Sequence, residues 1–236
     1  MKLFKFFGSS KVNKAEEFIQ EMGDEITQSN LQSTIEKGLA ECWNELREQI
    51  DSEELYSVGV YCGNLGFGDL TFTANTVQGL REKVSRCRAD DYYKDKTEEE
   101  LSLSSKWNAA DWKYHDNILS DHLDKASNIL SDLTERMYSF EENDGEYELQ
   151  EDVYDPGHEL IYQSIISAIT NFKSELSVKD EVVVGMFCGD ASYDFLLQKS
   201  ILVNKPVAIK LILKDLHRLG GIYKMNFLKD DYSYYN

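Results

Sequence analysis

The residues best suited to chemistry lie between positions 141 and 155, where eight residues are acidic and none is basic. Apolar and aromatic residues alternate with these acids. Carboxylates arranged in this way can pair with cationic side chains that would otherwise hold phosphates. A plain solvated loop has a similar composition, but the alternation favours a loop that contacts a basic partner. The residues expected to bind this partner are Glu141, Glu142, Asp144, Glu146, Tyr147, Glu148, Glu151, Asp152, Tyr154 and Asp155.

A second candidate site is a short segment with two tryptophans. Residues 106–115 read Lys-Trp-Asn-Ala-Ala-Asp-Trp-Lys-Tyr-His, so Trp107 lies five residues before Trp112. A segment this rich in aromatic rings is typical of a core anchor or of a lid over a sheet. Such rings can also stack on a ligand, and aromatic residues ringed by charge are typical of tight protein interfaces. We therefore include Trp107 and Trp112 among the partner-binding candidates.

Two of the four cysteines, Cys62 and Cys188, end apolar runs and precede a glycine. No Cys-x-x-Cys motif occurs, and free buried thiols in a reducing cytosol are the expected state. An enzyme with a cysteine-centred site is the catalytic alternative, with His158 or His217 brought close by folding. No Ser-His-Asp spacing and no HExxH motif favours another reaction, so we assign no catalytic residues.

The glycines and histidines predict no cofactor and no metal. The glycine-rich turn at 63–68 lacks phosphate-loop spacing, no Lys-Ser/Thr follows it, and Asp69 would repel a phosphate. His115 and His122 are seven residues apart, and no third ligand on the same helix face completes a metal site.

The charge balance restricts the partners of the protein. The 236 residues include 43 acidic and 25 basic ones, which gives a net charge of −18. Such a field repels nucleic acid and anionic membranes and attracts basic surfaces, although acidity also serves solubility. No apolar run approaches the ~18 residues of a membrane span, and the apolar start of the chain is too short for a signal peptide. We therefore expect a cytoplasmic protein that binds neither nucleic acid nor membrane directly.

Hydrophobic periodicity predicts long helices around a few strands. Residues 56–64 and 182–190 share Val-Gly, an apolar residue, an aromatic residue and Cys-Gly, which indicates two neighbouring buried strands. After the first copy, a glycine-rich turn and an alternating run predict a β-hairpin. We expect loops at 90–105 and 141–155, the second ended by Pro156-Gly157. Apolar residues at three- and four-residue spacing predict helices over 31–50, 76–88, 116–140, 160–176, 193–202 and 207–219.

These elements predict an α+β fold, with a small, mainly antiparallel sheet flanked by several long amphipathic helices. Three clear strands are few for this length, so we expect further short strands near 92–106 or 222–228. Residues 1–29 are expected to form a helical N-terminal extension and residues 30–221 a single α+β domain. Residues 222–236 are expected to form an aromatic tail over the surface.

Several motifs, taken in order, resemble the bacterial DUF4303 family. They are Glu-Leu-Tyr-Ser-Val-Gly-Val-Tyr at 54–61, Thr-Ala-Asn-Thr at 73–76, Lys-Trp-Asn-Ala-Ala-Asp-Trp at 106–112 and Val-Asn-Lys-Pro at 203–206. The resemblance covers roughly residues 30–218 of the chain. The acidic stretch and the Asn-Ala-Ala-Asp between the tryptophans depart from the family pattern. The matched residues are Tyr56, Ala74, Asn75, Thr76, Trp107, Trp112, Asp190, Asn204 and Pro206.

The resemblance also carries an expectation about function. Members of the family resemble immunity proteins encoded beside bacterial toxins, so the resemblance implies immunity and supplies no catalytic residues. Together with the charge, it leads us to expect an acidic cytosolic protein that neutralises a cognate toxin, such as a nuclease, by occluding a basic surface or active site. The alternatives are a small-ligand-binding module with the tryptophan segment as a lid, and the cysteine-centred enzyme. The oligomeric state is left open.

Overall fold

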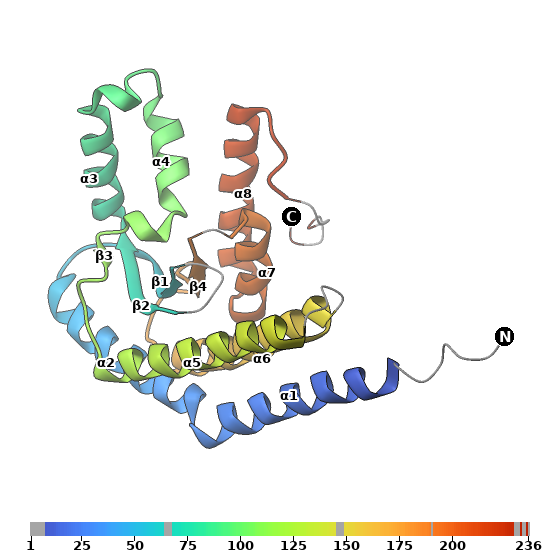
Figure 1. Cartoon of the computed structure of the whole chain (residues 1–236). Coiled ribbons are helices and arrows are strands. Elements are labelled where there is room, and N and C mark those ends of the chain that lie inside the picture. Colours follow the sequence, from blue (N-terminus) through green and yellow to red (C-terminus); the bar gives the residue numbers. More distant parts are fainter. Residues whose placement is uncertain are drawn as a thin grey trace.

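The two copies of the repeated phrase lie side by side as adjacent strands of one sheet (Figure 1). Strand β1 (Leu55–Cys62) pairs in parallel with β4 (Val183–Cys188), so that Gly59 lies opposite Gly185 and Cys62 opposite Cys188. A methyl group added at Gly59 would clash with the carbonyl oxygen of Gly185. The glycine of the first phrase is therefore required for the close packing of the two strands.

Within the described residues, the sheet has four strands in the order β3-β2-β1-β4. Strand β2 (Leu70–Thr76) is antiparallel to β1, and β3 (Tyr114–His115) is antiparallel to β2. The predicted α+β class is confirmed, and the sheet is mixed rather than purely antiparallel. The extra strand, β3, lies at the end of the tryptophan segment and not at the predicted positions.

The computed structural model describes residues 8–63, 68–144, 149–189 and 191–228, together with Tyr232 and Tyr235. The side chains of residues 8–15 and 140–155 lie outside this description. Within the described chain, no helix combines the length and the apolarity needed to cross a membrane.

One face of the sheet is covered by a layer of long helices, seen at the bottom of Figure 1. Val58 and Val60 of β1 and Met186 of β4 point into this layer and are fully buried with it. The predicted apolar stripe that begins at Leu31 and Ile35 faces the same core, as its three- and four-residue spacing requires. The helices of this layer are α1 (Gly8–Gln28), α2 (Leu31–Gln49), α5 (Asp121–Asp144) and α6 (Leu149–Glu175).

The opposite face carries a second core that joins the tryptophan segment to the C-terminal helices. Phe187 of β4 packs here with Trp107 and Trp112. In the tail, Leu228 and Tyr232 are also buried in this core, and the Tyr232 hydroxyl donates to Asp194 Oδ1 at 3.0 Å. The helices on this side are α3 (Val77–Arg88), α4 (Glu98–Lys106), α7 (Tyr193–Val203) and α8 (Pro206–Tyr223). Two short 3-10 turns lie along this part of the chain: η1 (Asp91–Tyr93) between α3 and α4, and η2 (Ala109–Asp111) between α4 and β3.

Two predicted loops are wrong for identifiable reasons. Helix α4 occupies much of 90–105, and its N-cap Thr97 accepts a hydrogen bond from the Glu100 amide. The sequence contains this capping signal, but the absence of regularly spaced apolar residues led to the prediction of a loop. Pro156 lies inside α6 instead of preceding it, and the backbone of 141–144 and 149–155 is helical. A methyl group at Gly157 would clash with Met137 of α5. The close packing of α5 against α6 at this point therefore overrides the local preference of Pro-Gly to end a helix.

The free edge of β4 is closed by one side chain from the end of α7. Asn204 Nδ2 donates to the Val184 carbonyl oxygen at 2.7 Å, and Asn204 Oδ1 accepts from the Val184 amide at 3.0 Å. Asn204 Oδ1 also accepts a 2.6 Å hydrogen bond from Lys173 Nζ. The side-chain amide thus occupies the place that a neighbouring strand would take, and it satisfies backbone groups that an edge leaves unpaired.

Replacing this side chain should destabilise the fold. Asn204→Ala leaves both polar groups of Val184 without their partner and is expected to lower the free energy of unfolding by about 2–4 kcal/mol. Asn171→Ala is the matched control, because Asn171 is exposed and bonds only to Glu36 on the surface, so the loss should stay below about 0.5 kcal/mol. Urea unfolding followed by circular dichroism measures both values. Equal unfolding midpoints for the two variants would contradict the role of Asn204.

Candidate functional site

The tryptophan segment is fixed to the sheet by hydrogen bonds to one backbone carbonyl. The carbonyl oxygen of Lys106 accepts from the Tyr56 hydroxyl at 3.0 Å and from Trp112 Nε1 at 3.1 Å. The Tyr56 hydroxyl in turn accepts from Asn75 Nδ2 at 2.9 Å. Burial raises the pKa of Tyr56, so its hydroxyl keeps the proton that it donates.

A charged pair extends this network to the start of β1. Lys113 Nζ lies 2.5 Å from Glu53 Oε1, and the Thr76 hydroxyl donates to Glu53 Oε2 at 2.6 Å. Burial acts against the charged form of Glu53, but the hydrogen bonds from Lys113 and Thr76 and the charge of Lys113 outweigh it, so the pKa of Glu53 lies below its usual range. The hydrogen bond to Glu53 raises the pKa of Lys113. Both directions favour the ion pair.

Both tryptophans lie in the interior. Trp107 is 5% exposed and Trp112 is 4% exposed. The ring of Tyr56 meets each of them edge to face, with centroids 6.0 Å apart, and Trp112 meets Phe187 at 4.6 Å. In this structure the two rings therefore anchor the segment, and Trp107 in addition borders a cavity.

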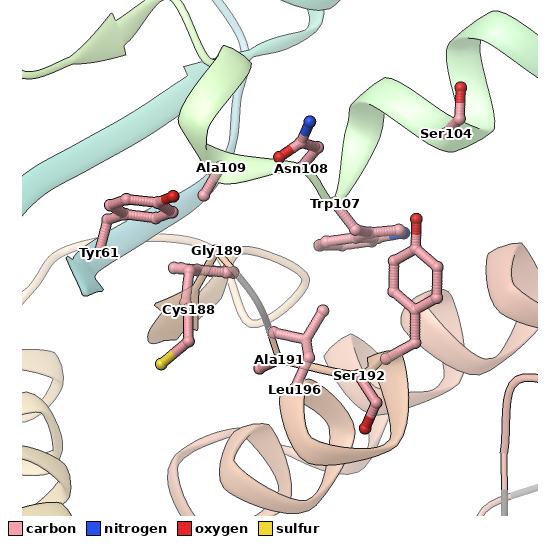
Figure 2. Close-up of a pocket in the computed structure, with 12 residues that line it drawn as sticks. Tyr61, Ser104, Trp107, Asn108, Ala109, Cys188, Gly189, Ala191, Ser192 and Leu196 are labelled. Carbon is pink, nitrogen blue, oxygen red and sulfur yellow. The ribbon is translucent and has the colours of Figure 1, made fainter. Parts of the chain in front are cut away.

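This cavity, of about 450 Å³, lies at the carboxyl ends of β1 and β4 (Figure 2). Asn108 and Ala109 form one wall, and the residues that lead into α7 form the opposite wall. A methyl group at Gly189 would clash with the Tyr61 hydroxyl, so the glycine lets the end of β4 approach this ring. No described residue that lines the cavity carries a charge. The lining includes the aromatic residues Tyr61, Trp107, Phe187 and Tyr193 and the polar residues Ser104, Asn108 and Ser192.

Two of the cysteines are adjacent, at the ends of β1 and β4. Cys62 and Cys188 are opposite each other in register, and all four cysteines are free. The hydrogen bond with Cys188, together with burial, raises the pKa of the Cys62 thiol well above its usual range, which disfavours the nucleophilic thiolate. Figure 2 shows the Cys188 sulfur turned away from Trp107 and the cavity. No hydrogen bond from His158 or His217 to either thiol is found among the described residues.

The ten candidates in the acidic stretch, from Glu141 to Asp155, lie outside the described side chains. Their neighbours on the helical layer are described, and a patch of acids surrounds Cys42 on the seam between α2 and α5. Burial, followed by the negative charges of Glu45, Glu41 and Asp124, raises the pKa of the Cys42 thiol to about 12. In the part of the chain that the structure describes, no group of three His, Cys, Asp or Glu side chains is placed to hold a metal ion.

The fold and these sites define an acidic α+β protein that has a neutral aromatic cavity on one side of its sheet and an acidic helical layer on the other. The chain belongs to the family described as Domain of unknown function (DUF4303), whose model matches residues 35–202. No curated protein and no solved structure matches the chain. The predicted family is thus confirmed, while immunity and bacterial origin remain predictions.

Most of the residues that carried the family resemblance have structural roles in this chain. Tyr56, Asn75 and Trp112 hold the tryptophan segment through the Lys106 carbonyl. Asn204 closes the edge of β4. Thr76 caps α3 by accepting a hydrogen bond from the Gly79 amide, and Pro206 begins α8, whereas Asp190 lies outside the described residues.

Sequence reasoning missed Glu53, Lys113, Ala191 and Ser192. Ser192 gave a usable signal, because a serine followed by a helical pattern predicts an N-cap, and its hydroxyl accepts from the Phe195 amide. The Glu53–Lys113 pair spans 60 positions and leaves no local pattern to read.

The Glu53 pair should contribute pH-dependent stability. At pH 7, Glu53→Gln is expected to lower the free energy of unfolding by about 1–3 kcal/mol, because a charge-assisted hydrogen bond is lost. The folded pKa is depressed, so this stabilisation is complete above the unfolded value of about 4.3 and disappears as the pH falls through the folded pKa. Urea unfolding at a series of pH values should show the two proteins converging in acid. The neighbouring, exposed Glu54→Gln should follow wild type throughout, and a constant gap between wild type and Glu53→Gln would refute the assignment.

The thiols should react slowly. At neutral pH, Cys42 and Cys62 are expected to react with Ellman's reagent at least about a hundredfold more slowly than free cysteine, since burial and neighbouring groups suppress the thiolate. In guanidinium chloride all four thiols should react at the free rate, which serves as the internal control. Fast labelling of Cys62 in the folded protein would restore the cysteine-centred enzyme.

Proposed function

We propose that this protein is an immunity protein, which binds a basic protein toxin through the acidic outer faces of α1, α2 and α5 and blocks the toxin's active site. The single observation that carries the proposal is the uneven pairing of its acidic side chains across the two sides of the sheet. The family membership is compatible with this role but does not supply it.

On the side of α3, α4 and α8, several acids are paired with cations, while Asp90, Asp91 and Asp95 are exposed without an ion pair among the described residues. Lys83 lies 2.7 Å from Asp111, and Lys106 lies 2.7 Å from Asp215. Glu99 pairs with Arg218. Acids neutralised in this way add little to the external electric field of the protein. Exposed ion pairs of this kind also contribute little to its stability.

On the outer faces of α1, α2 and α5, most acids have no cationic partner. Among the described side chains of these three helices, Glu25 pairs with Arg136 and Glu41 pairs with His122. The second pair is charged only when the histidine is protonated. Helices α1, α2 and α5 all belong to the layer on one side of the sheet (Figure 1). The exposed acids in the described part of this layer that have no ion pair are Glu16, Glu17, Glu21, Asp24, Glu45, Glu48, Asp121, Asp124, Asp132 and Glu135.

A surface with an excess of carboxylates is suited to a partner with an excess of cations. Electrostatic complementarity of this kind accelerates association and selects the partner more than it increases final affinity. Cationic active sites that hold phosphates, such as those of nucleases, are partners of the required chemistry. Of the acidic stretch, residues 141–144 belong to the end of α5 and residues 149–155 to the start of α6, two helices of the same layer.

Charge reversal tests the proposal against the purified protein encoded by the neighbouring gene, which the proposal requires to be a toxin. Glu45→Lys and Asp124→Lys, both on the α2–α5 seam, are each expected to weaken binding about tenfold, mainly through slower association. Asp95→Lys is the matched control, because Asp95 is equally exposed but lies between α3 and α4. Surface plasmon resonance at low and high salt measures rates and affinity, and the wild-type complex should weaken as salt rises.

An inhibition assay tests whether binding of this protein neutralises the toxin. An excess of wild-type protein should abolish toxin activity, and Glu45→Lys should require more protein for the same inhibition. The proposal fails if the toxin stays active at excess, or if Asp95→Lys weakens the complex as much as the variants on the seam.

A further inference from the structure

We propose that the cavity at the carboxyl ends of β1 and β4 binds an uncharged, flat heterocycle of the nucleobase class, as a free base or nucleoside. This site is separate from the acidic layer, and the inference does not depend on toxin binding. Three observations lead to it: the position of the cavity, the chemistry of its lining and an unpaired hydrogen-bond donor on Trp107.

The position is one where parallel strands commonly present ligands. The carboxyl ends of β1 and β4 meet at one edge of the sheet, and the chain after β4 turns at Gly189 and enters α7 at Tyr193. Ligands of open sheets bind outside the carboxyl ends of parallel strands, where the following loops diverge. The volume of about 450 Å³ falls within the range of small-molecule sites.

The lining selects for a neutral aromatic ligand. Tyr61, Trp107, Phe187 and Tyr193 provide ring surface, and the hydroxyl and amide groups of Ser104, Asn108 and Ser192 provide polar contacts. Aromatic side chains bind the flat faces of bases by stacking. No lysine or arginine is among the described lining residues, and Asp194 in the first turn of α7 opposes the attraction of that helix end for anions. A base or nucleoside therefore fits better than a nucleotide.

Trp107 supplies the observation that points to a ligand. Its Nε1–H has no hydrogen-bond partner although the residue is 95% buried, whereas the equivalent N–H of Trp112 donates to the Lys106 carbonyl. Figure 2 shows the Trp107 indole lying across the cavity, with its nitrogen on the side away from Tyr61. A buried donor without a partner is costly, and an acceptor on a bound heterocycle would relieve that cost.

Calorimetric titration of the full chain with adenosine, guanosine, cytidine and uridine tests the proposal, with saturation-transfer NMR to identify the bound protons. At least one nucleoside should bind at or below about 1 mM. Trp107→Phe, which keeps an aromatic ring and removes the N–H, should weaken that binding about tenfold. The matched control is Trp43→Phe, since Trp43 packs against Phe172 on the other face of the sheet and should leave binding unchanged.

A second variant keeps the test decisive if Trp107→Phe fails to fold. Ala191→Leu adds bulk at the cavity wall opposite Asn108 and should abolish binding without lowering the unfolding midpoint. The proposal is overturned if no nucleoside binds, or if folded Ala191→Leu binds as wild type does. It is equally overturned if methyl glucoside, a nucleoside monophosphate or a short single-stranded oligonucleotide binds more tightly than every nucleoside, because these results would point to a sugar, an anion or a nucleic acid instead.

Discussion

The parallel pairing of β1 with β4 is the constraint on which the rest of the structure depends. Parallel strands cannot be joined by a tight turn, so the chain between them has room for β2, β3 and four helices, α3 to α6. Because both strands end at the same edge, Tyr61 of β1 and Cys188 of β4 line the cavity together. The same register places Cys62 against Cys188. One pairing thus explains the repeated phrase, the thiol pair and the position of the cavity.

The carbonyl oxygen of Lys106 is the second point on which the arrangement depends. It joins a tyrosine of β1 and a tryptophan of the segment after α4, and the Lys106 ammonium reaches Asp215 on α8. Three parts of the fold therefore meet at one residue. This explains why motif residues that look like a ligand-binding set, with two tryptophans, a tyrosine and an asparagine, are used mainly to hold the wall of the cavity. A family signature built from such residues identifies a shared scaffold, and it does not identify the residues that bind a ligand or carry out a reaction.

Local patterns were enough to predict the class of the fold and most of its helices. The stripe from Leu31 to Leu46 and the two Val-Gly phrases are strong signals, because each has the period of its element and is buried as that period requires. Parallel pairing had no local signal, since a strand buried on both faces reads as a continuous apolar run in either orientation. Pro156 was misread because packing against Met137, which is distant in sequence, decides the path of α6. The cavity could not be predicted without the pairing that creates it.

The two tryptophans show a different limit of prediction from sequence. Their spacing indicated a concentration of aromatic surface, but a core anchor, a lid and an interface all require the same residue types. What separates these roles is burial and the fate of each indole N–H, which depend on Lys106, Tyr56 and Phe187 around them. The sequence therefore identified the segment, but three-dimensional contacts were needed to distinguish the two tryptophans. The indole N–H of Trp112 has a hydrogen-bond partner, whereas that of Trp107 has none.

The distribution of charge gives the two proposed sites different physical requirements. The net charge of −18 is concentrated where acids lack partners, while on the other side Lys83, Lys106 and Lys113 neutralise theirs. The sheet lies between the acidic helical layer and the core that carries the tryptophan segment. An uncharged ligand interacts only weakly with the field of the acidic layer. A charged partner on the helical layer depends on salt, whereas a neutral ligand in the cavity does not, so ionic strength separates the two activities even within one molecule.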